Sequence, residues 1–541
     1  MPGRRKKNLS RFERFRRWMF GSGHLGYDPE ARELFRRLAE ANGFDLWPPD
    51  RSAEWEVSPD LSLHQGVEWR DQSREEMLGL NLSAQGLWGL LDLSGLTALE
   101  RLYLAGNELE ALRLDDNDGL KELDLAGNRV FRLNLRGAPN LEDLDLSANR
   151  LTSLDLSQNR HLVSVCVSDN RLIELDLSGA LKLRRLLADS NQLTEIRVDK
   201  CPDLTFLAVF ENRLSDLDLS RNALLETLSA SDNQLRGLDL THNPHLAYLN
   251  VYNTGLSELD LRLNSQLWYL VAVGNQLEEL DLSGQRHLTH LALSGNLLAA
   301  LEVGRNKNLR TLDVADNRLE SLDLTPNQNL WYVYAALNRL RELDLSANPH
   351  LLILDVSQNR LTGLQLARCP KLQRLLAADN QIGRLDVSHN PDLERLFVTR
   401  NPLENIHFGP HRHKRLKEVD LSEGRLPLSV LKKCVGRGSE LTLLGPQNQV
   451  FFEELKLPAG PGCRLDLSSE ASFESCPSSF TVLNENREPA PPSLARVEGG
   501  LVYFRRPGRY QVRISHPLVV SNTPGHFEPA QVFTGWIEVT G

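Results

Sequence analysis

Cysteine and methionine are scarce in this chain of 541 residues, which contains only 6 Cys and 3 Met. No CxxC pair occurs, and the other cysteine spacings do not indicate a disulfide-stapled domain. We therefore expect free thiols, kept in a reducing compartment or used as small buried side chains. Cys463 and Cys476 are the one pair close enough in sequence to test for a disulfide.

Long hydrophobic runs are also missing. No segment approaches the ~18 consecutive apolar residues of a membrane-spanning helix. The N-terminus is basic, but no apolar stretch of about 7–15 residues follows it, as a secretory signal peptide would require. A cytoplasmic location is the default expectation, with export by a non-Sec route as the alternative.

Catalytic signatures are absent as well. The sequence has no Walker A loop, GxSxG elbow, HExxH helix or dinucleotide-binding fingerprint. We therefore predict a protein that is not an enzyme and needs no cofactor or metal. His407, His411 and His413 lie close together. Because no fourth ligand is evident, a solvated basic linker is favoured over a zinc site.

Charge is unevenly distributed. The formal net charge is −10, yet residues 1–20 carry eight Lys or Arg against the single acidic Glu13. The remaining chain is acidic, which argues against nucleic-acid binding on it. On a helix, Phe12, Phe15 and Met19 would share one face of the basic segment. This pattern suits contact with a membrane surface or a partner, and a solvated terminus is the alternative.

What the sequence has in abundance is a repeat. Asparagine recurs every 21 residues from Asn107 to Asn401, and only one of the fifteen positions, Thr254, departs from this rule. Such a constant register indicates a stacked repeat architecture. An inward Asn at a tight corner can bond to backbone groups that the turn leaves unpaired. We therefore predict a structural role for this Asn ladder.

Each repeat contains two short segments in which leucine or valine alternates with other residues. Residues 162–182, with the sequence LVSVCVSDNRLIELDLSGALK, show both segments. Alternation with period two is typical of a strand with one buried face, and about ten residues leave no room for a helix. We predict a mainly β solenoid with two parallel strands per coil. One set forms face A (LxxLxVxxN) and the other forms face B (LxxLDLSxN).

The flanking regions differ from the repeats. Asp28 suits a helix N-cap and Gly43 a helix stop, which predicts a short helix over 29–41 in a cap on the first coil. Strand-like runs separated by Gly, Pro and Ser turns predict a C-terminal β-sandwich. The predicted parts are a basic flexible N-terminus (1–27), a helical or irregular cap (28–77), a solenoid of about 15 coils (78–409), a linker with a terminal half-coil (410–439) and the sandwich (440–541).

The repeats resemble those of a known family. The segments LDLSANRLTSLDLSQN (144–159) and LDVSQNRLTGLQL (354–366) resemble the 21-residue leucine-rich repeats of internalin-like bacterial surface proteins. The resemblance implies a leucine-rich-repeat solenoid that recognises proteins, commonly at a cell surface and often followed by an immunoglobulin-like module. The run PGRYQVRI resembles the tyrosine-bearing strand of such modules, with Tyr510 as the corner tyrosine.

The two faces differ in their outward positions. On face B the central outward column is monotonous and acidic, as Asp155, Asp176, Asp218 and Asp239 illustrate. A solubilising stripe whose carboxylates bond nearby turns is favoured, and a site for divalent cations or a basic partner is the alternative. On face A the columns vary from coil to coil and hold an aromatic cluster. Its members are Phe206, Phe210, Tyr248, Tyr252, Tyr269, His290, Tyr332 and Tyr334.

Outward aromatic rings on a rigid sheet are costly to expose and are preferred anchors of binding surfaces. We therefore predict a recognition scaffold that binds a protein partner through this cluster. The alternatives are a glycan bound by the same rings beside Asp313 and Asp355, and a spacer that displays the C-terminal domain. The rings could also only stabilise the sheet, or be covered by a terminal segment. Thr254, beside Tyr252, predicts a local irregularity in its coil.

Overall fold

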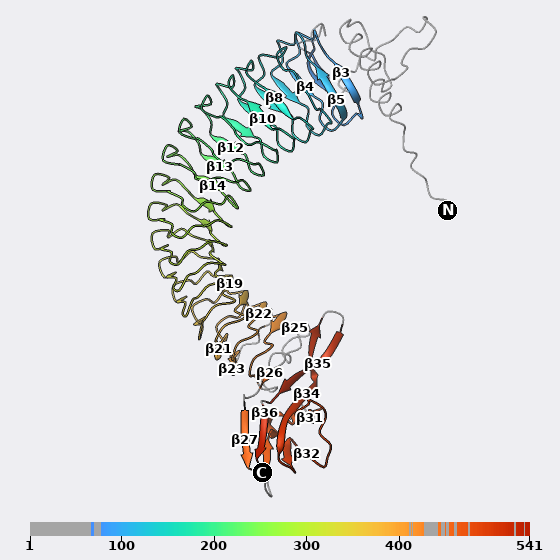
Figure 1. Cartoon of the computed structure of the whole chain (residues 1–541), viewed down its shortest axis with the longest axis vertical. Coiled ribbons are helices and arrows are strands. Elements are labelled where there is room, and N and C mark those ends of the chain that lie inside the picture. The colour runs from blue at the N-terminus through green and yellow to red at the C-terminus, as the bar shows by residue number, and fades with distance from the viewer. Residues whose placement is uncertain are drawn as a thin grey trace, which may run out of the picture. The chain divides into compact units, whose positions relative to one another are not determined.

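The computed structural model describes residues 67–69, 77–409, 413 and 415–426 and, with short gaps, 442–540. The chain divides into two compact units, Met1–Leu267 and Trp268–Gly541. In each unit the repeats wind into coils that stack on one another (Figure 1). The basic N-terminus and the helix predicted over 29–41 lie outside the described residues.

Each coil buries the regularly spaced apolar side chains of its repeat. In the coil that contains β12 (Phe206–Ala208), Leu204, Leu207, Val209 and Leu214 have no exposed surface. A single coil cannot bury such a face by itself, so neighbouring coils stack and form one continuous apolar core. Truncating a leucine in such a core to alanine costs about 2–5 kcal/mol.

The face-A strands of the first unit pair in parallel. Phe206 pairs with Thr227 and Thr227 pairs with Tyr248, so the register advances by one repeat at each step. The inward Leu207 and the outward Phe206 confirm the predicted alternation. The strands are β2 (Met77–Asn81), β4 (Arg101–Tyr103), β6 (Glu122–Asp124), β7 (Asp143–Asp145), β9 (Ser164–Cys166), β11 (Arg185–Leu187), β12, β13 (Thr227–Ser229) and β14 (Tyr248–Asn250).

A short strand precedes the first coil. β1 (Val67–Trp69) runs antiparallel to β2, with Val67 opposite Leu80. The described residues of the predicted cap (28–77) thus contain a strand and no helix. Antiparallel pairing occupies the open edge of β2, which would otherwise present unpaired N–H and C=O groups.

The second unit continues the same pattern. Tyr269 pairs with His290, and Tyr332 pairs with Ile353. Its face-A strands are β15 (Tyr269–Val271), β16 (His290–Ala292), β17 (Thr311–Asp313), β18 (Tyr332–Tyr334), β19 (Ile353–Asp355), β20 (Arg374–Leu376), β22 (Arg395–Phe397) and β24 (Glu418–Asp420).

Face B is less regular than face A. The prediction of two parallel strands per coil holds where face-B segments of neighbouring coils pair, which happens at three places in the described chain. In the other described coils the face-B segment is extended chain that does not pair as a strand with its neighbours. The pairs are β3 (Trp88–Asp92) with β5 (Glu108–Arg113), β8 (Ser153–Asp155) with β10 (Glu174–Asp176), and β21 (Arg384–Asp386) with β23 (Asn405–His407).

The Asn ladder has the structural role predicted for it. The Asn149 side-chain amide donates to the carbonyl oxygens of Leu125 (2.9 Å) and Leu146 (3.1 Å), and its Oδ1 accepts the N–H of Val130 at 2.9 Å. Each carboxamide thus joins the turn of its own coil to the backbone of the preceding coil. Every such bond contributes about 1 kcal/mol net, while a buried group left unpaired costs more.

The coils continue into residues 410–439, where we predicted a linker and a terminal half-coil. β24 pairs in parallel with β22, with Glu418 opposite Arg395. His413, which we expected in a solvated linker, is 5% exposed and its Nε2 lies 3.0 Å from the carbonyl oxygen of Phe408. His407 is exposed, and His411 lies outside the described residues. Within those residues no three His, Cys, Asp or Glu side chains gather as a metal site would require.

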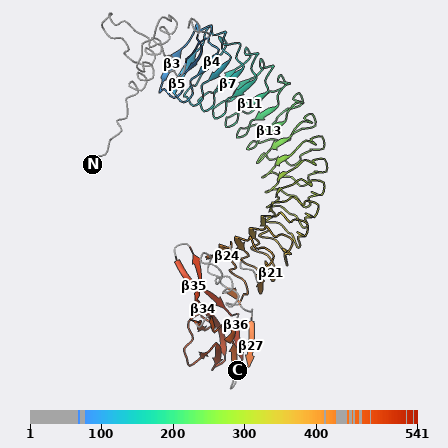
Figure 2. The same ribbon diagram turned by 180° about the vertical axis from the view of Figure 1, so that it is seen from behind.

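The C-terminal strands join the same sheet as the last coils. β25 (Thr442–Leu444) pairs with β24 on one side and with β34 (Gly508–Thr523) on the other. β34 also pairs with three antiparallel neighbours, and Figure 2 shows it beside β35. The remaining elements are β26 (Gln449–Val450), β27 (Glu454–Pro458), β28 (Arg464–Asp466), the 3-10 helix η2 (Ser468–Glu470), β29 (Ser472–Phe473), β30 (Cys476–Pro477), β31 (Ser479–Leu483), β32 (Ala495–Glu498), β33 (Leu501–Phe504), β35 (His526–Phe533) and β36 (Trp536–Thr540).

Tyr510 lies buried in this C-terminal region. Its hydroxyl donates to the carbonyl oxygen of Arg506 at 3.1 Å, a bond to backbone four residues upstream. A corner tyrosine makes a bond of this kind. The immunoglobulin-like assignment of residues 440–541 nevertheless stays a prediction. Among the described residues, no helix has the length and apolar character needed to cross a bilayer.

Candidate functional site

The register of face A determines where the predicted aromatic side chains lie. In the first unit Phe206 and Tyr248 occupy one outward column, with Thr227 between them. Both rings are half-buried. Phe210 and Tyr252 follow the strands on the turn that leads to the Asn ladder, and Tyr252 is 41% exposed. The four residues of this unit therefore lie on two parallel columns of one face.

A cation accompanies the first of these rings. Arg185 is the register partner of Phe206, and its guanidinium carbon lies 4.1 Å from the centroid of the phenyl ring. Stacking of this kind contributes roughly 0.5–1 kcal/mol at exposed sites. The arginine covers part of the ring and adds a positive charge to this part of face A.

The second unit begins with a compact aromatic group. The centroids of Trp268 and Tyr269 are 5.5 Å apart, those of Tyr269 and His290 are 5.5 Å apart, and those of Trp268 and His290 are 6.3 Å apart. Partial burial lowers the pKa of His290, and the nearby positive charge of Arg310 lowers it further. The lowered pKa favours the neutral imidazole, which forms the third ring of the group.

A second aromatic group lies farther along the same unit. Thr311 separates His290 from Tyr332 in their common column. Tyr332 and Tyr334 lie on one strand as outward neighbours of the buried Val333. Trp331, which precedes this strand, is 39% exposed and carries the guanidinium of Arg310 over its ring at 5.0 Å.

Two tryptophans add exposed aromatic surface beside the predicted cluster. Trp268 and Trp331 directly precede β15 and β18 and are 44% and 39% exposed, and each follows a fully buried leucine, Leu267 or Leu330. The equivalent position in other coils holds charged residues such as Arg184 and Glu226. These charged residues could have indicated from the sequence that the position is exposed.

Carboxylates flank the outermost tyrosine. In the sheet register Tyr334 lies between Asp313 and Asp355. Burial raises the pKa of Asp313, although bonds from the Ala315 N–H and the Ser294 hydroxyl oppose the shift, and the charge of Asp355 adds to it. Burial also raises the pKa of Tyr334. No ion pair with a described residue neutralises Asp313, so this half-buried charge is compensated only by neutral donors.

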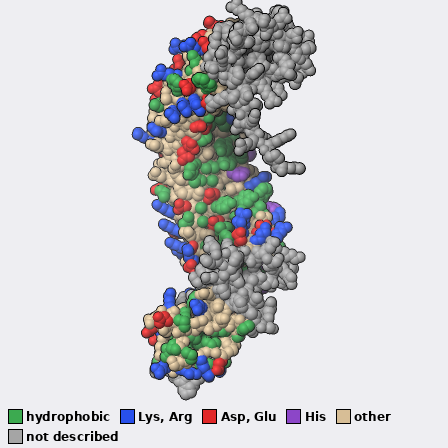
Figure 3. Space-filling view, turned by 90° about the vertical axis from the view of Figure 1, so that its right-hand side faces the viewer, with side chains coloured by type: hydrophobic (Ala, Val, Ile, Leu, Met, Phe, Trp, Pro, Cys, Tyr) green, Lys and Arg blue, Asp and Glu red, His purple; other side chains and the backbone are tan. Residues whose placement is uncertain are grey.

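The space-filling view in Figure 3 shows the side of the molecule that lies to the right in Figure 1, and hydrophobic side chains and histidine gather there. Face B shows the opposite character. Its carboxylates bond to their own turns: Asp239 accepts the N–H of Thr241 at 2.9 Å and its hydroxyl at 2.6 Å. These bonds lower the pKa of Asp239, and the equivalent Asp323 repeats them with Thr325. The acidic column therefore stabilises turns, as the favoured interpretation predicted.

Sequence reasoning overlooked a second ladder of buried amides on the face-B side. Asn222 donates to the carbonyl oxygens of Val198 (3.0 Å) and Cys201 (2.8 Å), and Asn243 makes the equivalent two bonds in the next coil. Cys201 and Cys369 occupy the same column. Burial raises the pKa of both thiols to about 11. They are therefore unsuited to nucleophilic chemistry.

Comparisons with known proteins agree with this geometry. No described protein family and no curated sequence matches the chain, but solved structures do. The functional domain of InlJ from Listeria monocytogenes is 24% identical with a TM-score of 0.59, over 78% of this chain and 91% of that one. YopM from Yersinia enterocolitica is 27% identical with a TM-score of 0.58, over 84% and 89%. The chain is a leucine-rich-repeat solenoid, similar in fold to these bacterial proteins.

The leucine-rich-repeat fold also extends to a plant receptor. The ectodomain of the membrane receptor kinase GASSHO1/SCHENGEN3 from Arabidopsis thaliana is 22% identical with a TM-score of 0.57, over 78% of this chain and 62% of that one. At this level of identity the likeness concerns the fold alone. The leucine-rich repeats of this chain are thus a common scaffold, and its distinctive chemistry lies in the outward positions of face A.

Proposed function

We propose that this leucine-rich-repeat solenoid binds a protein partner through the outward aromatic side chains of face A. The observation that carries the proposal is the exposure of Trp268 and Trp331, 44% and 39%, among half-buried tyrosines on a rigid sheet. Trp, Tyr and Arg are the residues most enriched at binding hot spots. Large exposed rings are costly unless a partner covers them.

Other solenoids of the same fold support this proposal. The Arabidopsis ectodomain is described in complex with CASPARIAN STRIP INTEGRITY FACTOR 2. The fold can therefore hold a ligand. The buried thiols with raised pKa and the turn-bound carboxylates of the described coils fit a recognition role better than a catalytic one.

The charges beside the rings indicate what the partner presents. Asp313 and Asp355 flank Tyr334, and neither carboxylate forms an ion pair within the described residues. A basic side chain placed over Tyr334 would meet a ring face and two carboxylates at once. We therefore expect the partner to contact this part of face A with an arginine or a lysine.

A glycan is the second candidate for the same surface. Flat rings stack on sugars, and the carboxylates of Asp313 and Asp355 can accept hydrogen bonds from hydroxyl groups. This candidate rests on the same residues as the first. The two therefore differ in the ligand and not in the site.

One set of variants separates these functions. The triple variant Tyr269→Ala, Tyr332→Ala, Tyr334→Ala removes the rings, and Phe131→Ala removes an exposed aromatic side chain outside face A as a control. Circular dichroism confirms the fold, and an affinity pull-down and a glycan array are repeated with each variant. Loss of protein partners in the triple variant alone supports the proposal. Loss of sugar binding alone favours the glycan, and unchanged results in both assays favour a structural spacer.

A further inference from the structure

Leu337 stands on a turn of the second unit where the neighbouring coils carry glycine or polar residues. It follows β18, its backbone φ is +57°, and its side chain is 46% exposed. L-residues rarely adopt this left-handed conformation, and leucine has no polar group that could stabilise it locally. Its backbone bonds as in the other coils, since its N–H donates to the carbonyl oxygen of Ser357 at 2.9 Å. The coil therefore imposes the conformation on the leucine.

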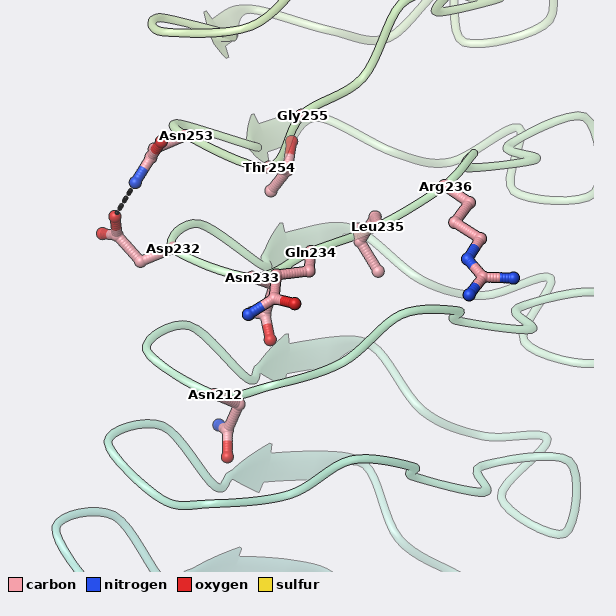
Figure 4. A pocket seen from close by; sticks show the side chains of 9 residues that line it. All are labelled: Asn212, Asp232, Asn233, Gln234, Leu235, Arg236, Asn253, Thr254 and Gly255. Carbon is pink, nitrogen blue, oxygen red and sulfur yellow. Dashed lines mark hydrogen bonds between the residues drawn. The ribbon is translucent and has the colours of Figure 1, made fainter.

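The equivalent residues of other coils form polar contacts with one another. In the first unit the side-chain amide of Asn253 donates to the carboxylate of Asp232 at 2.8 Å (Figure 4). In the second unit the guanidinium of Arg400 donates to the carboxylate of Asp379 at 3.2 Å. The two members of each pair are 21 residues apart, so these bonds join successive coils at this turn.

Leu337 interrupts this series of polar contacts. The equivalent residues of the coils before and after it are Asp316 and Gln358. Among the described residues, neither of these two side chains has a hydrogen-bond partner. The leucine therefore combines a disfavoured backbone conformation, an exposed apolar side chain and the lack of a polar contact to either neighbour. Conformational outliers of this kind cluster at ligand-binding sites.

Three aromatic side chains precede Leu337 on the same coil. Trp331 is 39% exposed, and Tyr332 and Tyr334 are the half-buried outward residues of β18. With Leu337 they form a row of four large side chains, which follows the direction of the strand and not the stack of coils. Contiguous apolar surface of this kind is typical of an interaction site.

Carboxylates border this row. Asp313 and Asp355 flank Tyr334 in the sheet register, and Asp316 lies one repeat before Leu337. Within the part of the chain that the structure describes, none of the three carboxylates forms an ion pair. A segment with positive charge is therefore favoured on the row, whereas a second copy of the same row would bring like charges together.

We propose that Leu337 belongs to the partner-binding surface, and that its coil receives an extended segment in which a basic residue stands two positions from a large apolar residue. Alternate side chains of an extended chain point the same way at intervals of about 6.6 Å, twice the rise of ~3.3 Å per residue. The basic side chain would lie over Tyr334, and the apolar one would cover Leu337. The inference rests on the function proposed for the aromatic side chains and adds a residue and a sequence class to it.

Fluorescein-labelled pentapeptides test the proposal by fluorescence anisotropy with the full-length protein. The first probe is Leu-Ser-Arg-Ser-Leu, so that either direction of the segment places a leucine over Leu337. In the second probe Gln replaces Arg, and in the third probe Ser replaces both Leu residues. We expect saturable binding of the first probe and binding weaker by about tenfold for the other two.

Leu337→Asn separates a binding role from a structural one. Asparagine tolerates the left-handed region and can donate to Asp316, as Asn253 donates to Asp232. The thermal unfolding midpoint should therefore equal that of the wild type or exceed it. The affinity for the first probe should fall by about tenfold. Leu263→Asn, at a leucine that is 57% exposed outside face A, is the matched control and should leave the affinity unchanged.

Two results would overturn the inference and leave the proposed function standing, provided that the tyrosine triple variant still loses its partners in the pull-down. One is equal affinity of the wild type and Leu337→Asn for the first probe, and the other is a first probe that shows no saturable binding. A dimer in analytical ultracentrifugation that Leu337→Asn dissociates would also overturn it, because a second copy would then cover the row. Unchanged partners in the triple variant would instead contradict the proposed function itself.

Discussion

The guanidinium carbon of Arg310 lies 5.0 Å from the centroid of the Trp331 ring. The two residues belong to the same outward column in successive coils, and the backbone N–H of Trp331 donates to the carbonyl oxygen of Arg310 at 2.8 Å. The arginine therefore restricts the orientations that the indole can adopt. A ring that is already ordered loses less conformational freedom when a partner covers it.

This stacking should be measurable as a coupling energy. Arg310→Ala and Trp331→Leu, alone and combined, form a double-mutant cycle in urea unfolding. We expect a coupling of about 0.5–1 kcal/mol, the usual size of an exposed cation–π contact. Additive effects of the two substitutions would show that the contact contributes nothing to stability.

The Asn ladder predicts a larger effect at a buried position. Asn338 donates to the carbonyl oxygen of Val314 at 2.8 Å and accepts the N–H of Leu319 at 2.9 Å. Asn338→Ala leaves the Leu319 N–H unpaired, whereas the Val314 carbonyl oxygen keeps its bond from Asn317 at 3.2 Å. The variant should therefore lower the unfolding free energy by about 1–3 kcal/mol. The exposed Asn308, which donates one bond to Arg286, is the control. Asn308→Ala should stay within about 0.5 kcal/mol of the wild type, and equal losses would refute the ladder's role.

The half-buried Asp313 makes stability depend on pH. Burial raises its pKa above the ordinary value of 3.8. Below pH 3.8 the side chain is protonated in the folded and unfolded chains alike. As pH rises through the interval between the two pKa values, the unfolded chain ionises first, so folding loses stability until the folded pKa is passed.

Asp313→Asn removes this loss. The variant should melt at a higher temperature than the wild type at pH 7, and the difference should shrink as pH falls through the folded pKa towards 3.8. Differential scanning calorimetry of both proteins across this range provides the measurement. A constant difference at all pH values would show that the substitution acts through packing and not through charge.

The buried thiols should be inert in the folded protein. Cys201 and Cys369 have no exposed surface, and burial raises their pKa to about 11. Because the thiolate is the reactive species, iodoacetamide at pH 8 should leave both unmodified until denaturant is added. Peptide mapping by mass spectrometry reports each site separately. Modification of either cysteine in the native protein would contradict the described packing.

Much of the fold could be predicted from the sequence because the same 21-residue pattern recurs in coil after coil. The period-two pattern placed Leu207 inward and Phe206 outward, and the Asn register placed Asn149 at the corner of its coil. Face B departed from prediction in most coils, because its segments pair as strands at only three places in the described chain. Carboxylate bonds to the following turn do not explain the difference, since Asp155 and Asp176 make them within the paired strands β8 and β10.

The candidate site was less predictable. Columns of outward residues could be aligned from the repeat, which identified Tyr269, Tyr332 and Tyr334. The exposure of Trp268 and Trp331 depends on where the strand begins within the coil, and alternation alone does not determine that. The burial of His413 was missed for a related reason, since an insertion before β24 shifts the register by two residues.

The Asn ladder also gives the solenoid a direction. Asn149 bonds to backbone groups of Leu125 and Val130, which belong to the coil before its own. Each coil is thus completed by the one that follows it along the chain. A cut between two coils breaks the bonds that the first asparagine of the C-terminal fragment makes to the coil before it. The N-terminal fragment is left with unpaired backbone groups and the C-terminal fragment with a carboxamide that has lost those partners. The two new ends therefore need different caps, a side-chain donor and acceptor on the N-terminal fragment and backbone groups on the C-terminal fragment.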